Sequence, residues 1–356
     1  MLGVARRVPM MSAGWGAAAV GGGRGGGQVV VAACVTRCRR GVAYNALDPP
    51  AVSWVAKSPK WMQPYLRLSR ADRPIGTWLL MWPCTWSLTL AAAADGLPEA
   101  LPALVSNVAL FGAGALIMRS AGCVVNDMWD AELDRSVERT RDRPLASGEL
   151  ARRQAAAYVV GHGFAGLGIL AQYDLSTIAL GASSLGLVVA YPYMKRITYW
   201  PQLFLGLTFN WGVWLGYAAQ SGSALGMPIE VLAPLYGSGV AWTLLYDTIY
   251  ARSDMKDDVK VGIKSSALAT AHAPRAYLGA FAAASTGLLA VSGVMAGLGA
   301  PFFALSVVGG GAHLAWQVAS LQLDSATDAV AKFRANSQYG ALVASGFVAD
   351  ALVSAL

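Results

Sequence analysis

The segment that decides the fold is residues 276–323, AYLGAFAAASTGLLAVSGVMAGLGAPFFALSVVGGGAHLAWQVASLQL, which contains no Asp, Glu, Lys or Arg. A helix that crosses a bilayer needs about 20 apolar residues, so the segment can form two, with a break at residues 297–301. Of the 356 residues, 55% are hydrophobic and 13% are charged, whereas a soluble domain carries about 25% charged residues. This composition excludes a soluble globule and a disordered chain, and it predicts an all-α polytopic membrane protein.

The remaining sequence divides into further apolar stretches of similar length, which gives nine predicted spans. The last of them is the weakest because it carries Asp350. The predicted spans are residues 75–94, 101–124, 155–173, 175–194, 201–220, 230–247, 276–297, 301–321 and 339–356.

The basic residues alternate along this division. Of the 27 Lys and Arg residues, eleven precede the first span, fifteen follow even-numbered spans, and Arg119 lies within the second span. The loops after spans one, three, five and seven contain none. By the positive-inside rule, all basic loops lie on the cytoplasm-equivalent face, which is the matrix in a mitochondrial protein. The net charge of +7 therefore reflects topology and a basic leader, and it does not indicate a nucleic-acid partner.

The leader is residues 1–47, which contain six Arg and no Asp or Glu before Asp48. Such a composition is typical of an organelle transit peptide. We expect a mitochondrial transit peptide over 1–47, an amphipathic juxtamembrane segment over 48–74 and a membrane domain over 75–356. A plastid transit peptide and a disordered basic tail are the alternatives for the leader.

Two acidic clusters carry the candidate chemistry. Residues 126–134, NDMWDAELD, follow the second span, and residues 247–258, DTIYARSDMKDD, follow the sixth, so both lie on the basic face. On a helix, residues four or seven apart share a face. This spacing predicts two columns of oxygen ligands: Asn126, Asp127, Asp130 and Asp134 in the first cluster, and Asp247, Asp254 and Asp258 in the second.

Columns of hard oxygen ligands suit Mg²⁺, which keeps some waters and is completed by substrate phosphates. Two facing columns could hold two or three Mg²⁺ ions around a diphosphate. One alternative is that the acids pair with neighbouring Arg and Lys at a wet membrane surface. Another is a proton or cation pathway, although a pathway would distribute acids through the depth of the spans, and these acids cluster at one end.

Basic residues accompany both clusters. Arginine offers a bidentate fork to phosphate and lysine a point charge, so beside the metal columns some of them would neutralise a leaving diphosphate. Each one alone is explained by the positive-inside rule. The candidates are Arg135, Arg139, Arg141 and Arg143 after the first cluster, and Lys195 and Arg196 at the end of the fourth span.

The first cluster, N-D-x-x-D-x-x-x-D over 126–134 followed by R-x-V-x-R-T-x-x-R-P-L over 135–145, resembles the intramembrane aromatic prenyltransferases. The core of the second cluster, Asp254-x-x-x-Asp258, is similar to the other Asp-rich motif of that family. Residues 70–80, 191–202 and 246–251 look like its 4-hydroxybenzoate branch. One departure is Arg252-Ser253, where members often carry His-Gln.

The resemblance implies a nine-transmembrane-helix bundle around a central cavity open to the matrix side of the mitochondrial inner membrane. It implies Mg²⁺-dependent transfer of a polyprenyl chain from polyprenyl diphosphate to the 3-position of 4-hydroxybenzoate in ubiquinone biosynthesis, with membrane lipid as the surroundings. An association with other ubiquinone-biosynthesis enzymes stays open. The alternatives are another acceptor (haem, homogentisate or a naphthoate) and a transporter of an anionic metabolite.

The resemblance also implies roles for individual residues. One Mg²⁺ site would use Asn126, Asp127, Asp130 and Asp134, and the other Asp254 and Asp258. Lys195, Arg139, Arg143 and Arg196 would contact the donor. Asp247 would orient or deprotonate the phenol, Tyr191 would contact the acceptor ring, and Arg70 or Arg73 would receive the carboxylate of the acceptor.

Overall fold

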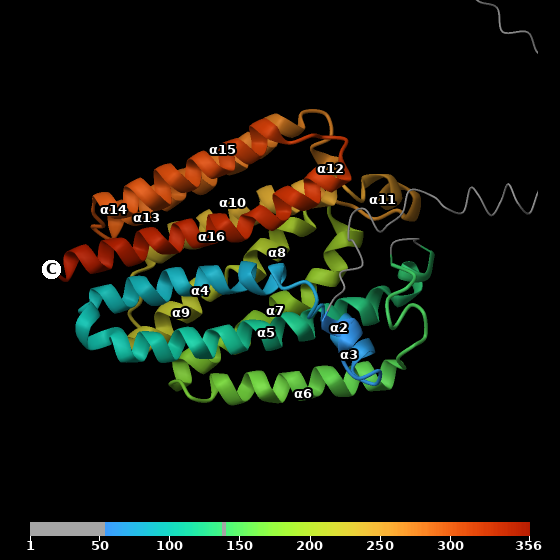
Figure 1. The fold of residues 1–356 in the computed structure, drawn as a ribbon. Coiled ribbons are helices and arrows are strands. Elements are labelled where there is room, and N and C mark those ends of the chain that lie inside the picture. Colours follow the sequence, from blue (N-terminus) through green and yellow to red (C-terminus); the bar gives the residue numbers. More distant parts are fainter. Residues whose placement is uncertain (1–53, 137–139) are drawn as a thin grey trace, which may run out of the picture. The chain divides into compact units, whose positions relative to one another are not determined.

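The computed structural model describes residues 54–136 and 140–356, and its regular elements in these ranges are all helices (Figure 1). The predicted transit peptide over 1–47, residues 48–53 of the predicted juxtamembrane segment, and Arg139 lie outside the described residues. Within 54–74 the chain forms two short helices, α2 (Trp54–Lys57) and α3 (Gln63–Leu68).

The predicted spans coincide with helices from α4 onwards. The elements are α4 (Ile75–Ala94), α5 (Leu97–Ser136), α6 (Arg152–Leu170), α7 (Leu175–Ile197), α8 (Pro201–Phe209), α9 (Gly212–Ser221), α10 (Ile229–Ala251), α11 (Met255–Val261), α12 (Ser266–Ala269), α13 (Pro274–Met295), α14 (Ala300–Phe302), the π-helical η2 (Phe303–Gly309), α15 (Gly310–Ser320) and α16 (Ala326–Ser354). Within the described residues, four helical stretches are long and apolar enough to cross a membrane: α5, α7, α13 and the run from α14 to α15. The count of nine spans stays a prediction.

The fifth predicted span is not one continuous helix. It is divided into α8 and α9 around Asn210, whose side-chain Nδ2 donates to Gly206 O at 2.8 Å and to Thr243 Oγ1 at 3.0 Å. An Asn side chain that bonds to the preceding turn competes with the regular backbone pattern. The bond to Thr243 also fixes this break against α10.

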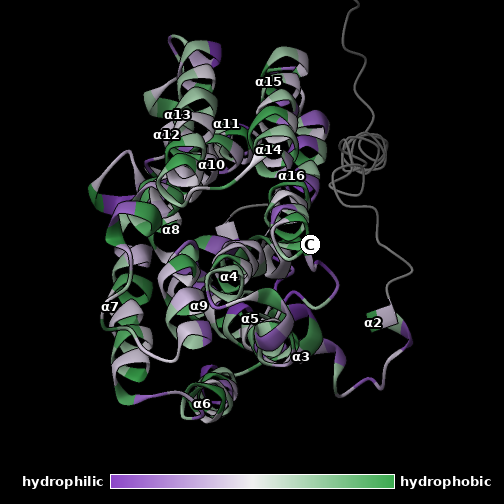
Figure 2. Ribbon diagram, turned by 90° about the vertical axis from the view of Figure 1, so that its left-hand side faces the viewer, coloured by the Kyte–Doolittle hydropathy of each residue, from purple (hydrophilic) through white to green (hydrophobic). Residues whose placement is uncertain are grey.

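Hydrophobic residues occur along most of the helices, as the green parts of the ribbon show (Figure 2), and many of them are exposed. On α6 the exposed residues include Val160, Phe164 and Leu167, and on α7 they include Leu185 and Val189. Contiguous apolar patches of this kind are rare on soluble monomers. They suit a lipid environment, where the hydrophobic effect does not oppose their exposure.

The core lies where α4, α10 and α16 pack together. The ring centroids of Trp86 and Trp242 are 5.4 Å apart, and those of Trp242 and Tyr339 are 5.0 Å apart. Both indole N–H groups are satisfied, with Trp86 donating to Gly340 O at 3.0 Å and Trp242 to Asn336 Oδ1 at 2.8 Å. This aromatic core fixes α10, the helix that leads into the second acidic cluster.

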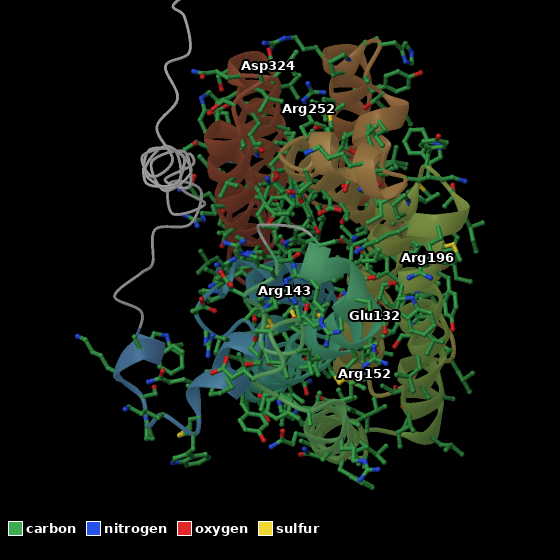
Figure 3. The ribbon with its side chains drawn as sticks, turned by 90° about the vertical axis from the view of Figure 1, so that its right-hand side faces the viewer. Glu132, Arg143, Arg152, Arg196, Arg252 and Asp324 are labelled. Carbon is green, nitrogen blue, oxygen red and sulfur yellow. The ribbon has the colours of Figure 1, made fainter. Side chains whose placement is uncertain are left out.

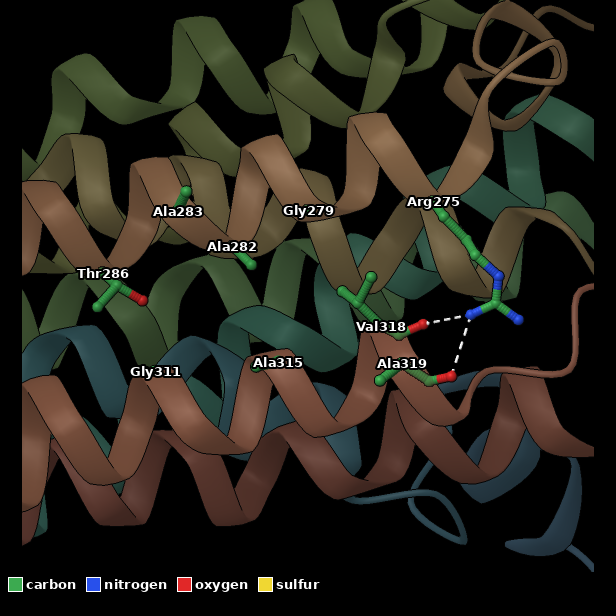
Figure 4. A pocket seen from close by; sticks show the side chains of 9 residues that line it. All are labelled: Arg275, Gly279, Ala282, Ala283, Thr286, Gly311, Ala315, Val318 and Ala319. Atoms are coloured by element: carbon green, nitrogen blue, oxygen red, sulfur yellow. Dashed lines mark hydrogen bonds between the residues drawn. The ribbon is translucent and has the colours of Figure 1, made fainter.

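A hollow of about 530 Å³ lies between α13 and α15 and is lined mainly by Gly, Ala and Val (Figure 4). At its end, Arg275 Nη1 donates to the carbonyl oxygens of Val318 at 2.8 Å and Ala319 at 3.1 Å. These carbonyls belong to the last turn of α15, where a cation also complements the helix dipole. Arg275 therefore ties the start of α13 to the end of α15.

Small residues allow α4 and α9 to approach closely. A Cβ atom added to Gly216 would lie 2.5 Å from Ser87 Oγ and 2.8 Å from the backbone oxygen of Cys84, and one added to Gly212 would overlap Cys84 Sγ. Small residues at helix crossings are characteristic of membrane bundles.

We expect the substitution Gly216→Ala to lower the free energy of unfolding by about 1–3 kcal/mol, because the new methyl group overpacks this crossing. Thermal unfolding in detergent micelles measures the change. The matched control is Gly161→Ala on α6, where nothing lies within 4 Å of an added Cβ. An equal loss of thermal stability in the two variants would contradict the close packing of α4 and α9.

Candidate active site

The two acidic clusters meet in one pocket of about 260 Å³. It lies at the end of the bundle that faces the viewer in Figure 3. Its charged lining residues come from α5, the segment before α6, α7, α10 and the region of α11. They are Asp130, Asp134, Arg143, Lys195, Asp247, Asp254, Asp258 and Lys264.

The first cluster lies on the last turns of α5, which continues beyond the second apolar stretch to Ser136. Asp127 is 2% exposed and is held by two arginines. Arg70 Nη2 donates to its Oδ1 at 2.8 Å and its Oδ2 at 3.0 Å, and Arg143 Nη1 donates to its Oδ1 at 3.1 Å. Arg143 Nη1 also donates to Asp134 Oδ2 at 2.8 Å. We call Asp127, Asp134, Arg70 and Arg143 the ion-pair group.

Arg70 occupies an unusual backbone position. Its φ of 57° is the only positive φ of a non-glycine residue in the described parts of the chain. The backbone N–H of Arg70 donates to Arg67 O at 3.2 Å, and that of Ala71 donates to Leu66 O at 2.9 Å, which closes the end of α3. Glycine is usual at this position of the motif. The ion pair with Asp127 accounts for an arginine here despite the backbone strain.

The second cluster does not form one helical column, so that expectation was wrong. The helix α10 ends at Ala251, the chain turns, and α11 begins only after Asp254. The turn is held by Arg252, whose Nε and Nη2 donate to Leu323 O at 3.2 and 3.1 Å. The departure from the family pattern at this residue thus has a local structural role. Asp254 and Asp258 still line the pocket, as does Asp247 from the end of α10.

Lys195 joins the two clusters. Its Nζ lies 3.6 Å from Asp130 Oδ2 and 5.7 Å from the ring centroid of Tyr191, which precedes it by one turn of α7. The backbone oxygen of Lys195 accepts a hydrogen bond of 3.0 Å from the N–H of Lys264. This bond attaches the segment after α11 to the end of α7, so both lysines lie at the pocket.

Several predicted site residues lie elsewhere. Arg196 is exposed and lies at the edge of the end face, away from Arg143 (Figure 3). Arg73 is 38% exposed with its Nε 3.5 Å from Asp72 Oδ2. Neither of them lines the pocket. Asn126 does not line the pocket either. Arg70 and Asp127 also do not line it, and they are connected to it through Arg143, which bonds to Asp127.

Other lining residues were given no role by the sequence analysis. They include Lys264, Gln202 and Tyr250. Gln202 Oε1 accepts a hydrogen bond of 2.9 Å from the backbone N–H of Ser266, which fixes the segment after Lys264. Gln202 and Tyr250 fall within motifs that resemble the 4-hydroxybenzoate branch, and this was the one signal that could have identified them.

The carboxylates surround the pocket without converging. In residues 54–136 and 140–356, no three Asp, Glu, His or Cys side chains lie close enough together to form a metal site by themselves. The lining acids are instead distributed between α5 on one side and the α10–α11 region on the other.

Residues 80–339 match the UbiA prenyltransferase family. The chain belongs to this family. It is 44% identical over 310 residues to a protein of Caenorhabditis elegans named 4-hydroxybenzoate polyprenyltransferase, mitochondrial, with coverage of 86% of this chain and 84% of the relative. The predicted resemblance to membrane prenyltransferases is thereby confirmed.

Solved UbiA homologues share the fold. The apo structure of a homologue from Aeropyrum pernix K1 has a TM-score of 0.64 and 24% identity, and the match covers 76% of this chain and 97% of that chain. A homologue from Archaeoglobus fulgidus, bound to DMAPP and Mg²⁺, has a TM-score of 0.53 and 17% identity. The match covers 78% of this chain and 98% of that chain. The all-helical fold class is therefore confirmed.

We expect Arg143→Met to lower the free energy of unfolding by about 3 kcal/mol, because it leaves two largely buried carboxylates without this partner. The matched control is Arg152→Met, since Arg152 and its partner Glu132 are 63% and 80% exposed and such a pair contributes less than about 1 kcal/mol. Chemical unfolding in detergent compares the two. Equal losses would contradict a stabilising role for the ion-pair group.

Proposed function

We propose that this chain transfers a polyprenyl group from polyprenyl diphosphate to the 3-position of 4-hydroxybenzoate in ubiquinone biosynthesis. The observation that carries the proposal is one pocket in which carboxylates from two acidic clusters face basic side chains at the end of an apolar helical bundle. Family membership supports prenyl transfer, and the name of the nematode relative supports the acceptor.

The donor set of the pocket fits Mg²⁺. Within the described parts of the chain, no Cys or His lines it, and its acidic residues offer hard oxygen ligands. Mg²⁺ typically takes one or two carboxylates, several waters and substrate phosphates, so carboxylates spread around a pocket suit it. We place one ion at Asp130 and Asp134 and another at Asp254 and Asp258. When bound, Mg²⁺ would supply Lewis-acid stabilisation of the leaving diphosphate.

Asp127 then supports the first metal site without lining the pocket, and Asn126 stays a proposed member of that site. Asp127 orients Arg143 through their hydrogen bond, and Arg143 in turn contacts Asp134. Such outer contacts fix the direction of a metal ligand. Asp127 is accordingly a positioning residue in this proposal.

Basic side chains bind the diphosphate end of the donor. Arginine has five N–H donors, and Arg143 uses Nη1 for its two carboxylate contacts. Its other donors and Lys195 face phosphate oxygens in the pocket, and Lys264, whose Nζ also donates to Ile197 O at 3.1 Å, adds positive charge at the pocket wall. As the allylic C–O bond breaks, negative charge develops on the diphosphate, and these fixed cations stabilise it.

Asp247 and Tyr191 define the acceptor end of the pocket. The carbon ortho to the phenol attacks the allylic cation, and that carbon then loses its proton. We assign Asp247 to orient or deprotonate the phenol, which raises the electron density of the ring. Tyr191 packs against the ring, and the helices exclude bulk water, which would otherwise capture the cation.

We place the protein in the mitochondrial inner membrane with nine spans and the pocket facing the matrix. The nematode relative is named mitochondrial. The pocket is lined by Arg143, Lys195 and Lys264, all from loops or helix ends on the basic face, and basic loops remain on the side from which a membrane protein is inserted.

The function is tested by turnover in membranes that contain the full chain, with 4-hydroxybenzoate, a polyprenyl diphosphate and Mg²⁺. We expect a 3-polyprenyl-4-hydroxybenzoate product that EDTA abolishes and added Mg²⁺ restores. Asp254→Asn should lower kcat at least about 100-fold, because a metal ligand is lost. The control Asp142→Asn, at a side chain that is 88% exposed, should retain activity.

Near-normal turnover by a well-folded Asp254→Asn protein would refute the metal assignment. Absence of product from wild-type protein would lead to assays with haem, homogentisate and naphthoate acceptors. Absence of product with every acceptor would contradict prenyl transfer.

The topology is tested with single added cysteines. Ser147→Cys lies in the loop between α5 and α6, and Leu225→Cys lies between α9 and α10 at a residue that is 80% exposed. In mitoplasts, a membrane-impermeant maleimide should label the cysteine at 225 directly and that at 147 only after detergent. The native Cys84 and Cys123 are buried, and Cys34 and Cys38 of the predicted transit peptide are replaced by Ser in both variants. The reverse pattern would place the pocket on the opposite side.

A further inference from the structure

Arg119 is the one Lys or Arg within the predicted spans. It lies on α5, eight residues before Asp127, which places it about two helical turns deeper along the helix that carries the first acidic cluster. A charged side chain at membrane depth is costly and usually serves a site. The mechanism above gives Arg119 no role.

The Arg119 side chain lacks a hydrogen-bond or ion-pair partner among the described residues. Its Nε is buried without a hydrogen bond, and Arg119 forms no ion pair with any residue in 54–136 or 140–356. A buried polar group in a native protein normally has a partner, and an exception requires an explanation. A missing ligand is one such explanation.

The ion pairs around Arg119 leave its positive charge without a matching anion. In the ion-pair group, two carboxylates are balanced by Arg70 and Arg143, and Asp130 is paired with Lys195. The titratable neighbours that influence Arg119 are Arg70, Asp127, Tyr191 and Tyr246. The only acid among them is Asp127, which is already held by two arginines, so the charge of Arg119 remains uncompensated.

A second buried polar atom without a hydrogen-bond partner among the described residues belongs to Tyr246. The Tyr246 hydroxyl forms no hydrogen bond that meets ordinary geometry within the described residues, and Thr243 beside it already donates to Gly239 O at 3.0 Å. Arg119 and Tyr246 are electrostatic neighbours of one another. Both are also neighbours of Tyr191, which lines the pocket. Neither Arg119 nor Tyr246 lines the pocket itself, but each interacts electrostatically with Tyr191, which does.

We propose that Arg119, assisted by the Tyr246 hydroxyl, binds the carboxylate of the aromatic acceptor. The inference rests on the proposed function and assigns its acceptor-recognition site. Arginine with a hydroxyl donor suits a carboxylate, because charge-assisted hydrogen bonds to carboxylates are the strong ones. The ring then lies against Tyr191 with its phenol toward Asp247. Arg70 is paired with Asp127, and Arg73 is partly exposed beside Asp72. Arg119 therefore takes the carboxylate-binding role that the sequence had suggested for Arg70 or Arg73.

Gly76 on α4 makes room for this side chain. A Cβ atom at Gly76 would overlap Nε of Arg119 and lie 2.8 Å from its Cζ. The atoms that would be displaced are the far end of a flexible side chain, so Gly76→Ala should move the guanidinium with little cost to the fold. This variant displaces the charge without removing it.

The experiment compares two acceptors in membranes that contain the full chain and saturating polyprenyl diphosphate. One is 4-hydroxybenzoate, and the other is 4-hydroxybenzamide, which keeps the ring and phenol but lacks the negative charge. In the wild-type protein, kcat/KM should favour the benzoate by roughly 10- to 100-fold, the effect of a charged hydrogen bond. In Arg119→Met this preference should fall to near one, while the KM of the donor stays unchanged.

Gly76→Ala should reduce the same preference in part, and it provides the test if Arg119→Met does not accumulate in membranes. The control Arg152→Met, at an exposed arginine of the basic face, should keep the wild-type preference. If Arg119 had a purely structural role, Arg119→Met would lower kcat/KM for both acceptors by the same factor. An unchanged preference in both Arg119→Met and Gly76→Ala would overturn the inference while leaving the proposed function intact. Failure of the wild-type protein to prenylate either acceptor would overturn the proposed function itself.

Discussion

The structure depends on the pairing of Asp127 with Arg70 and Arg143. A carboxylate that is 2% exposed would be strongly destabilising unless cations compensate its desolvation. These two arginines come from the turn after α3 and from the segment between α5 and α6, so the pairing attaches both segments to the end of α5. Asp130 and Asp134 on the same end of α5 line the pocket, and Asp134 also accepts a hydrogen bond from Arg143.

The two acidic clusters singled out in the sequence line one pocket, and they stand out because charge is so restricted in this chain. Lipid excludes charged groups, so the few acids of an apolar chain must gather at helix ends. Helical spacing also identified Asp130 and Asp134 as residues of one face. It did not indicate that Asp127, which was grouped with them, pairs with Arg70 and Arg143 and does not line the pocket.

The features that sequence reasoning missed depend on contacts between distant residues. The break between α10 and α11 is held by hydrogen bonds from Arg252 to Leu323 O, and local spacing alone favours a continuous helix there. Lys264 reaches the pocket because its backbone bonds to Lys195. The position of Arg119 depends on the absence of a side chain at Gly76. None of these pairs forms a periodic pattern, so none is visible before the helices are packed.

The length of α5 has a consequence for how the substrates arrive. Its 40 residues extend about 60 Å, twice the roughly 30 Å of a bilayer core. The acids at its end therefore reach the aqueous boundary, while Arg119 remains at the depth of the acyl chains. A polyprenyl donor would enter sideways from the lipid, and a water-soluble aromatic acid would enter along the helix axis from the aqueous side. Separate routes of this kind would bring each substrate to the pocket from the phase in which it dissolves.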